Sequence, residues 1–203
     1  MFVGMRQVAP GIVHWTAKHP RIGIEVSSYL LVASGVLLDP LPPAAGFDAL
    51  AEWGEPRMVV LTNRHHHRAA AEAAERFGIP VRVSEPGVGE ASQHVAVQPF
   101  AWDEELAPGV RALEVGAICP DESAVLFTTE HALACADGVI RMGDGPLQFV
   151  PDQLIGDDPE TVKAGLRDAY LRLLDLPFEH LLLAHGDPVI GNGHEALAAF
   201  AGP

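Results

Sequence analysis

Short runs of apolar, β-branched residues recur along the chain and predict strands separated by turns. The segment 33–35 is a turn that joins the first two runs into a β-hairpin, and Glu130 and His131 form the turn of a later hairpin. Residues 86–98, which open with Pro and Gly, are expected to form a loop. The predicted strands cover residues 26–31, 36–38, 57–61, 81–83, 110–115, 124–128, 132–136 and 180–184.

Residues 66–77, 159–174 and 195–200 have the composition or periodicity of helices. The first is rich in alanine and is stopped by Gly78, and the second has one apolar stripe with acidic residues in its first turn. Strands interspersed with helices predict a mixed α/β fold. The sequence has no internal repeat and no dividing linker, so one domain over residues 1–203 is expected.

Size and charge narrow the range of partners. A chain of 203 residues with 48% hydrophobic content can bury one substantial core. Its 13 basic and 27 acidic residues give a formal charge of −14, which argues against nucleic acids and anionic membranes as partners. Two cysteines are too few for a disulfide framework, and residues 1–10 lack the apolar segment of an export signal. A cytoplasmic location is therefore expected.

A histidine-rich segment, Thr-Asn-Arg-His-His-His-Arg over residues 62–68, lies where a predicted strand gives way to a helix. In an extended backbone, residues two apart point to the same side, so His65 and His67 are expected to converge on one ion while His66 faces away. The alternative is an exposed cluster at the start of a helix, with Asn63 or Thr62 as its cap.

The strand ending in Thr62 together with this segment resembles the signature of the metallo-β-lactamase superfamily, in which such a strand leads into His-x-His-x-Asp-His and a helix. Further similar segments follow in the family's order: an early hairpin ending in Asp39, the strands around residues 103–127, Ala-Cys-Ala-Asp at 134–137, and Leu-Leu-Ala-His-Gly at 182–186. The resemblance implies a four-layer αββα sandwich and metal-dependent hydrolysis.

The family's ligand positions are only partly kept in this chain. The resemblance places Asn63 at the first histidine, His65 at the second, His67 at the aspartate, Arg68 at the histidine after it, Cys119 at the third histidine, Asp137 at the bridging aspartate and His185 at the last histidine. A guanidinium has only donors, so Arg68 cannot bind a metal. The motif is therefore degenerate.

The remaining candidate ligands are His65, His67, Cys119, Asp137 and His185, which suffice for one zinc or iron ion. Cys119 is either a ligand or a small buried hydrophobe. Asp137 is the candidate catalytic residue.

Other polar residues beside these ligands have two interpretations each. Asn63 and Arg68 are candidate substrate-binding residues; Asn63 alternatively caps the helix, and Arg68 alternatively pairs with Asp137 in place of an ion. Asp121 and Glu122, next to Cys119, either supply a carboxylate to the site or are solvated, and solvation is the expectation.

Two functions follow from this site. The first is a hydrolase in which one metal ion activates water against a small ester, thioester, lactone or phosphoester. The second is a metal-free domain of the same fold that has lost catalysis and binds a small molecule or a protein partner.

Overall fold

The computed structural model describes residues 4–202. Residues 1–3, where the segment considered as an export signal begins, and residue 203 lie outside the described part. The chain forms two compact units that divide between Ala101 and Trp102, named here the N-terminal unit and the C-terminal unit. A single domain over residues 1–203 stays a prediction.

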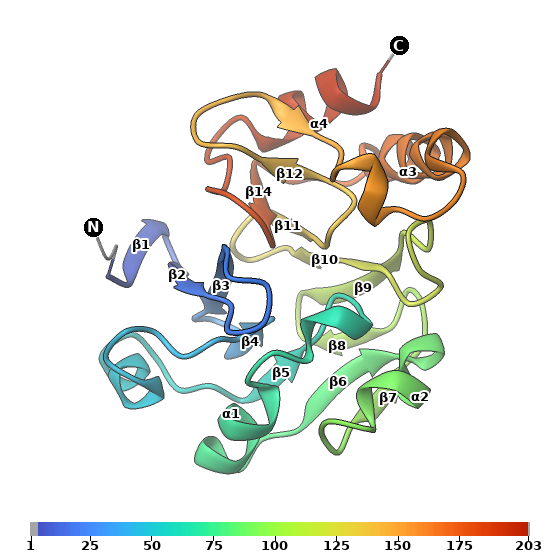
Figure 1. Cartoon of the computed structure of the whole chain (residues 1–203). Coiled ribbons are helices and arrows are strands. Elements are labelled where there is room, and N and C mark those ends of the chain that lie inside the picture. Colours follow the sequence, from blue (N-terminus) through green and yellow to red (C-terminus); the bar gives the residue numbers. More distant parts are fainter. Residues whose placement is uncertain (1–3, 203) are drawn as a thin grey trace. The chain divides into compact units, whose positions relative to one another are not determined.

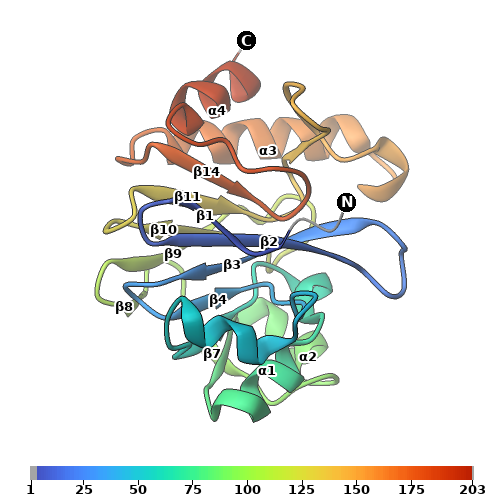
Figure 2. The same ribbon diagram turned by 90° about the vertical axis from the view of Figure 1, so that its left-hand side faces the viewer.

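The N-terminal unit is built on a sheet of seven strands in sequence order. Neighbouring strands are antiparallel from β1 to β4 and parallel from β4 to β7. Figure 2 shows β2, β3 and β4 side by side. The strands are β1 (Arg6–Ala9), β2 (Ile12–Lys18), β3 (Glu25–Leu31), β4 (Val36–Leu38), β5 (Met58–Val60), β6 (Val81–Ser84) and β7 (Gln98–Phe100).

Helix α1 (Ala70–Phe77) packs its buried face, which includes Ala70 and Ala73, on β5 and β6. It begins four residues later than the sequence predicts, because residues 64–67 form a separate 3-10 helix and Arg68 has a φ of 36°. Residues 86–98, which the sequence predicts to be a loop, contain the short helix α2. The other short helices are η1 (Phe47–Glu52), η2 (Arg64–His67), η3 (Glu85–Gly87) and α2 (Val88–Ala91).

The C-terminal unit has a five-stranded sheet in the order β14-β11-β10-β9-β8, in which only β11 and β14 are parallel. Helices α3 and α4 bury Leu166, Tyr170 and Leu197 with this sheet in one core (Figure 1). The elements are β8 (Glu105–Ala107), β9 (Val110–Glu114), β10 (Ser123–Phe127), β11 (Ala132–Cys135), β12 (Ile140–Arg141), β13 (Leu147–Gln148), η4 (Asp152–Leu154), α3 (Pro159–Leu173), β14 (His180–Leu183) and α4 (Gly193–Ala201).

None of the helices within residues 4–202 combines the length and the apolar character needed to cross a bilayer.

A buried carboxylate ties the ends of two parallel strands in the N-terminal unit. Asp39 follows β4, and its carboxylate accepts hydrogen bonds from the backbone N–H of Thr62 at 2.9 Å and from the Thr62 hydroxyl at 2.6 Å, just beyond β5. Burial by itself raises the pKa of Asp39, but the charge and hydrogen bond of His66, the charge of Arg68 and the Thr62 hydroxyl together lower it below the usual 3.8. The ionised carboxylate is therefore the form that the fold stabilises.

We expect Asp39→Asn to lower the free energy of unfolding at neutral pH by about 3 kcal/mol, because His66 and Arg68 lose a buried anion. A carboxyl group with a lowered folded-state pKa stabilises above its unfolded pKa, and this contribution disappears as the pH falls through the folded value. The difference between wild type and variant should therefore shrink below pH 3.8. Urea denaturation at a series of pH values measures it.

The matched control is Asp48→Asn, which removes a carboxylate that is 73% exposed and pairs with Arg76 in the same unit. It should change the free energy of unfolding by no more than about 0.5 kcal/mol. A difference between wild type and Asp39→Asn that stays constant through acid would show that the buried carboxylate is not the source of the effect.

Candidate functional site

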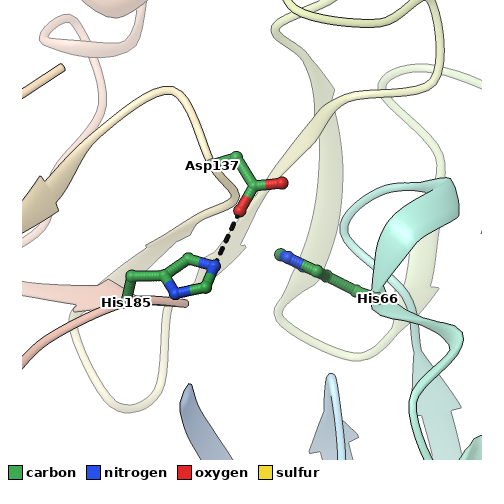
Figure 3. Close-up of side chains that lie close together, drawn as sticks. All are labelled: His66, Asp137 and His185. Carbon is green, nitrogen blue, oxygen red and sulfur yellow. Dashed lines mark ion pairs between the residues drawn. The ribbon is translucent and has the colours of Figure 1, made fainter. Parts of the chain in front are cut away.

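The parallel pairing of β11 and β14 brings two predicted site residues together. The register places Cys135 opposite Leu183, and Asp137 and His185 each follow two residues beyond that pair. Their side chains meet, with His185 Nε2 3.0 Å from Asp137 Oδ1, and both are about four-fifths buried. Figure 3 draws this ion pair as a dashed line, together with the imidazole of His66.

This pair has the chemistry and spacing of two ligands of one ion. Imidazole nitrogen and carboxylate oxygen both bind zinc at roughly 2.0–2.2 Å, so two ligands of a tetrahedral ion lie about 3.3 Å apart. The observed separation of 3.0 Å is close to that value. The separation of these two donor atoms is therefore compatible with two ligands of one transition-metal ion.

The backbone around His185 is fixed by β12. The carbonyl of His185 accepts a hydrogen bond from Arg141 N at 3.1 Å. Gly186 has a φ of 91°, and a Cβ atom there would lie 1.9 Å from the carbonyl oxygen of Arg141. Only glycine allows the chain to turn this close to β12, so Gly186 sets the position from which His185 reaches Asp137.

His66 in the N-terminal unit is 3% exposed and is oriented by polar groups on one side of its ring. Its Nδ1 lies 2.9 Å from Asp39 Oδ2 and 2.8 Å from Thr62 Oγ1. The Thr62 hydroxyl donates to Asp39, so both neighbours of Nδ1 act as acceptors and favour a proton on that nitrogen. Nε2 of His66 then carries the lone pair that a metal requires, the arrangement that orients many metal-binding histidines.

The expectation that residues 65–67 are extended, with His66 facing away, is wrong. Residues 64–67 form the 3-10 helix η2, in which the alternation of a strand does not apply. His65 is exposed, and the ring of His67 stacks on that of His94 with centroids 3.8 Å apart. The helical turn separates the two histidines that an extended chain would bring together, so their ligand roles stay predictions.

The side chains of Asn63 and Arg68 make hydrogen bonds to backbone groups of the N-terminal unit. The side chain of Asn63 accepts a hydrogen bond from His65 N at 2.9 Å and caps η2, as one of the two interpretations of the sequence predicts. Nη1 of Arg68 donates to the carbonyl oxygens of Ser27 at 2.6 Å and Asp39 at 2.7 Å. A role of either residue in substrate binding stays a prediction.

The loop before β10 departs from the sequence-based expectation. Asp121 and Glu122 are fully buried and not solvated, because the carboxylate of Glu122 accepts backbone N–H groups from Ile118 and Gly138. Cys119 in the same loop is 8% exposed and forms no disulfide. The burial of Glu122 was not predicted from the sequence, because two adjacent acids in a loop are usually exposed. Their position directly before an apolar strand is the one weak signal of burial that the sequence offers.

Comparison with solved structures gives the fold. A metallo-β-lactamase family protein from Thermus thermophilus superposes with a TM-score of 0.67 at 19% identity, over 96% of this chain and 80% of that chain. The metallo-β-lactamases of Erythrobacter litoralis, solved with β-mercaptoethanol in its active site, and of Pontibacter korlensis both give TM-scores of 0.69. Their identities are 16% and 17%, with 97% of this chain covered in each case and 95% and 97% of theirs.

These superpositions confirm the prediction of a mixed α/β fold of the metallo-β-lactamase type. No curated protein sequence matches the chain. The profile of the metallo-β-lactamase superfamily matches residues 6–202, which is nearly the whole sequence. The chain therefore belongs to the metallo-β-lactamase superfamily.

Proposed function

We propose that the protein is a hydrolase that binds one transition-metal ion through His66, Asp137 and His185. The observation that carries the proposal is the Asp137 and His185 pair, whose donor atoms lie 3.0 Å apart at the ends of two paired parallel strands. Imidazole nitrogen and carboxylate oxygen are common ligands of such an ion. Three protein ligands and one open position are the composition of catalytic zinc sites.

His66 replaces His65 and His67 in this proposed ligand set. Its Nδ1 is held by Asp39 and Thr62, so its ring is oriented before any ion binds. His65 is exposed, and His67 is engaged in the stack with His94. Cys119 remains a competing candidate, and measurement of the metal content of variants separates these alternatives.

When bound, such an ion acidifies a water molecule and polarises the carbonyl or phosphoryl oxygen under attack. The chain's own contribution is to position the reacting groups. Asp137 would bind the ion through Oδ1, the oxygen nearest His185 Nε2, and its other oxygen, Oδ2, would accept a proton from the attacking water. This second oxygen is the proposed catalytic group.

Cationic side chains near the histidine-rich segment favour a substrate that carries a negative charge. The pKa of His19 is lowered, first by burial and then by the charges of Arg68 and Arg21. Arg21 also acts, after burial and His94, to lower the pKa of His67. In a chain with a formal charge of −14, this local positive field favours a small ester, thioester, lactone or phosphoester with a carboxylate or phosphate group.

The proposed partner is thus a small molecule, and the proposed location is the cytoplasm. The buried cysteines Cys119 and Cys135 form no disulfide, which supports a reducing compartment.

Tag-free protein purified after growth in zinc- and iron-supplemented medium should contain about one transition-metal ion per chain by elemental analysis. His66→Ala, Asp137→Ala and His185→Ala should each reduce this content by about tenfold or more, whereas His65→Ala should leave it unchanged. Metal-free wild-type protein would favour a binding domain without catalysis. Loss of metal from His65→Ala or Cys119→Ala, but not from His66→Ala, would restore the ligand set that the sequence predicts.

His185→Ala should lower the melting temperature in zinc-containing buffer much more than in chelator, because an ion that binds only the folded state stabilises it by mass action. Differential scanning fluorimetry of both proteins in both buffers measures this difference. An equal loss in the two buffers would mean that His185 contributes through its pairing with Asp137 and not through a metal.

A further inference from the structure

A buried carboxylate behind Asp137 links two loops of the C-terminal unit. Glu122 is 0% exposed; its Oε1 accepts a hydrogen bond from Gly138 N at 2.9 Å, and its Oε2 accepts one from Ile118 N at 3.0 Å. Gly138 directly follows Asp137, and Ile118 directly precedes Cys119. The Glu122 side chain therefore binds the backbone of both loops, one residue from Asp137 in the first and one residue from Cys119 in the second.

The space around this carboxylate is closed by Tyr170 of α3. Tyr170 is 0% exposed, and its hydroxyl has no hydrogen-bond partner within residues 4–202. A Cβ atom added to Gly138 would lie 2.3 Å from that hydroxyl, 2.4 Å from Leu166 Cδ2 and 2.9 Å from Glu122 Oε1. The residue after Asp137 therefore lies close to all three side chains, and no larger residue fits there without movement.

Electrostatics agree with this geometry. Burial, followed by the charges of Glu122, Cys135 and Asp137, raises the pKa of Tyr170 well above its usual value. Burial and then Glu122 also raise the pKa of Cys135, the last residue of β11. The charge of Glu122 thus raises the pKa of two buried groups near Asp137, the Tyr170 hydroxyl and the Cys135 thiol.

We propose that Glu122 is a positioning residue that sets the orientation of Asp137 as a metal ligand by binding the N–H of Gly138. The inference rests on the proposed function, because it concerns the same ion. Only a carboxylate can fill this role, since its two oxygens satisfy two backbone donors at once, whereas a glutamine amide offers one acceptor and turns a donor toward the other N–H. Partners behind metal ligands typically change metal affinity by about 10- to 100-fold.

Cobalt(II) binding to the full chain tests the proposal, since its visible spectrum reports the number and geometry of the ligands without requiring a substrate. Glu122→Gln should raise the Kd for Co(II) by about 10- to 100-fold and change the visible bands. Glu114→Gln is the matched control; it removes an exposed carboxylate from β9 in the same unit and should leave both unchanged. An unaltered Kd and spectrum in folded Glu122→Gln, even with a lower melting temperature, would overturn the proposal.

A second pair of variants decides the matter if Glu122→Gln does not fold. Gly138→Ala should also weaken Co(II) binding, because the added methyl group pushes the backbone next to Asp137 away from Glu122 and Tyr170. Tyr170→Phe together with Leu166→Ala removes the hydroxyl and the Cδ2 atom that the methyl group meets, so the triple variant should regain part of the affinity. Wild-type affinity in Gly138→Ala, or no recovery in a folded triple variant, would contradict the proposal.

Failure here is distinguishable from failure of the proposed function. Wild-type protein that binds no Co(II) would overturn both proposals together. Wild-type protein that binds Co(II) through His66, Asp137 and His185, with Glu122→Gln indistinguishable from it, would leave the metal site intact and remove only the role of Glu122.

Discussion

The register between parallel strands is the constraint on which the candidate ligands of each unit depend. Adjacent parallel strands end at the same edge of a sheet, so residues at similar offsets beyond their ends become neighbours. In the C-terminal unit, the pairing of Cys135 with Leu183 brings Asp137 to His185. In the N-terminal unit, the pairing of Leu38 with Val60 brings Asp39 to Thr62, and through Thr62 to His66. A shift of one residue in either register would separate these groups.

Much of the fold could be predicted because the buried strands carry a strong local signal. The runs at β3, β4, β10 and β11 are apolar and β-branched or alanine-rich, and α3 has one apolar stripe, so the predicted limits fall within a residue or two of those observed. Strands β1 and β2 were not predicted. Strand β2 mixes His14, Trp15 and Thr16 and buries its polar His14 against Ser27, which hides the apolar pattern.

The site was harder to predict than the fold because side-chain convergence depends on local backbone conformation. The serial order of the family's segments predicted that Asp137 and His185 lie together, and their side chains are 3.0 Å apart; their role as ligands stays a prediction. The assignment within residues 65–67 depended on an extended backbone, and the cap by Asn63 instead begins a helical turn that places His66 inside. The burial of Glu122 could not be predicted because the sequence alone does not distinguish a buried glutamate from a solvated one. The distinction comes from the two backbone donors that its carboxylate binds in the folded chain, Ile118 N and Gly138 N.

Arg68, at the position that the resemblance assigns to a histidine ligand, donates from its guanidinium to the carbonyls of Ser27 and Asp39. A guanidinium keeps its charge at any pH a protein meets, and no chelator removes it. The carbonyls of Ser27 and Asp39 are thus bound by a covalent part of the chain and not by an exchangeable ion. This link between β3 and the end of β4 persists whether or not the protein carries a metal.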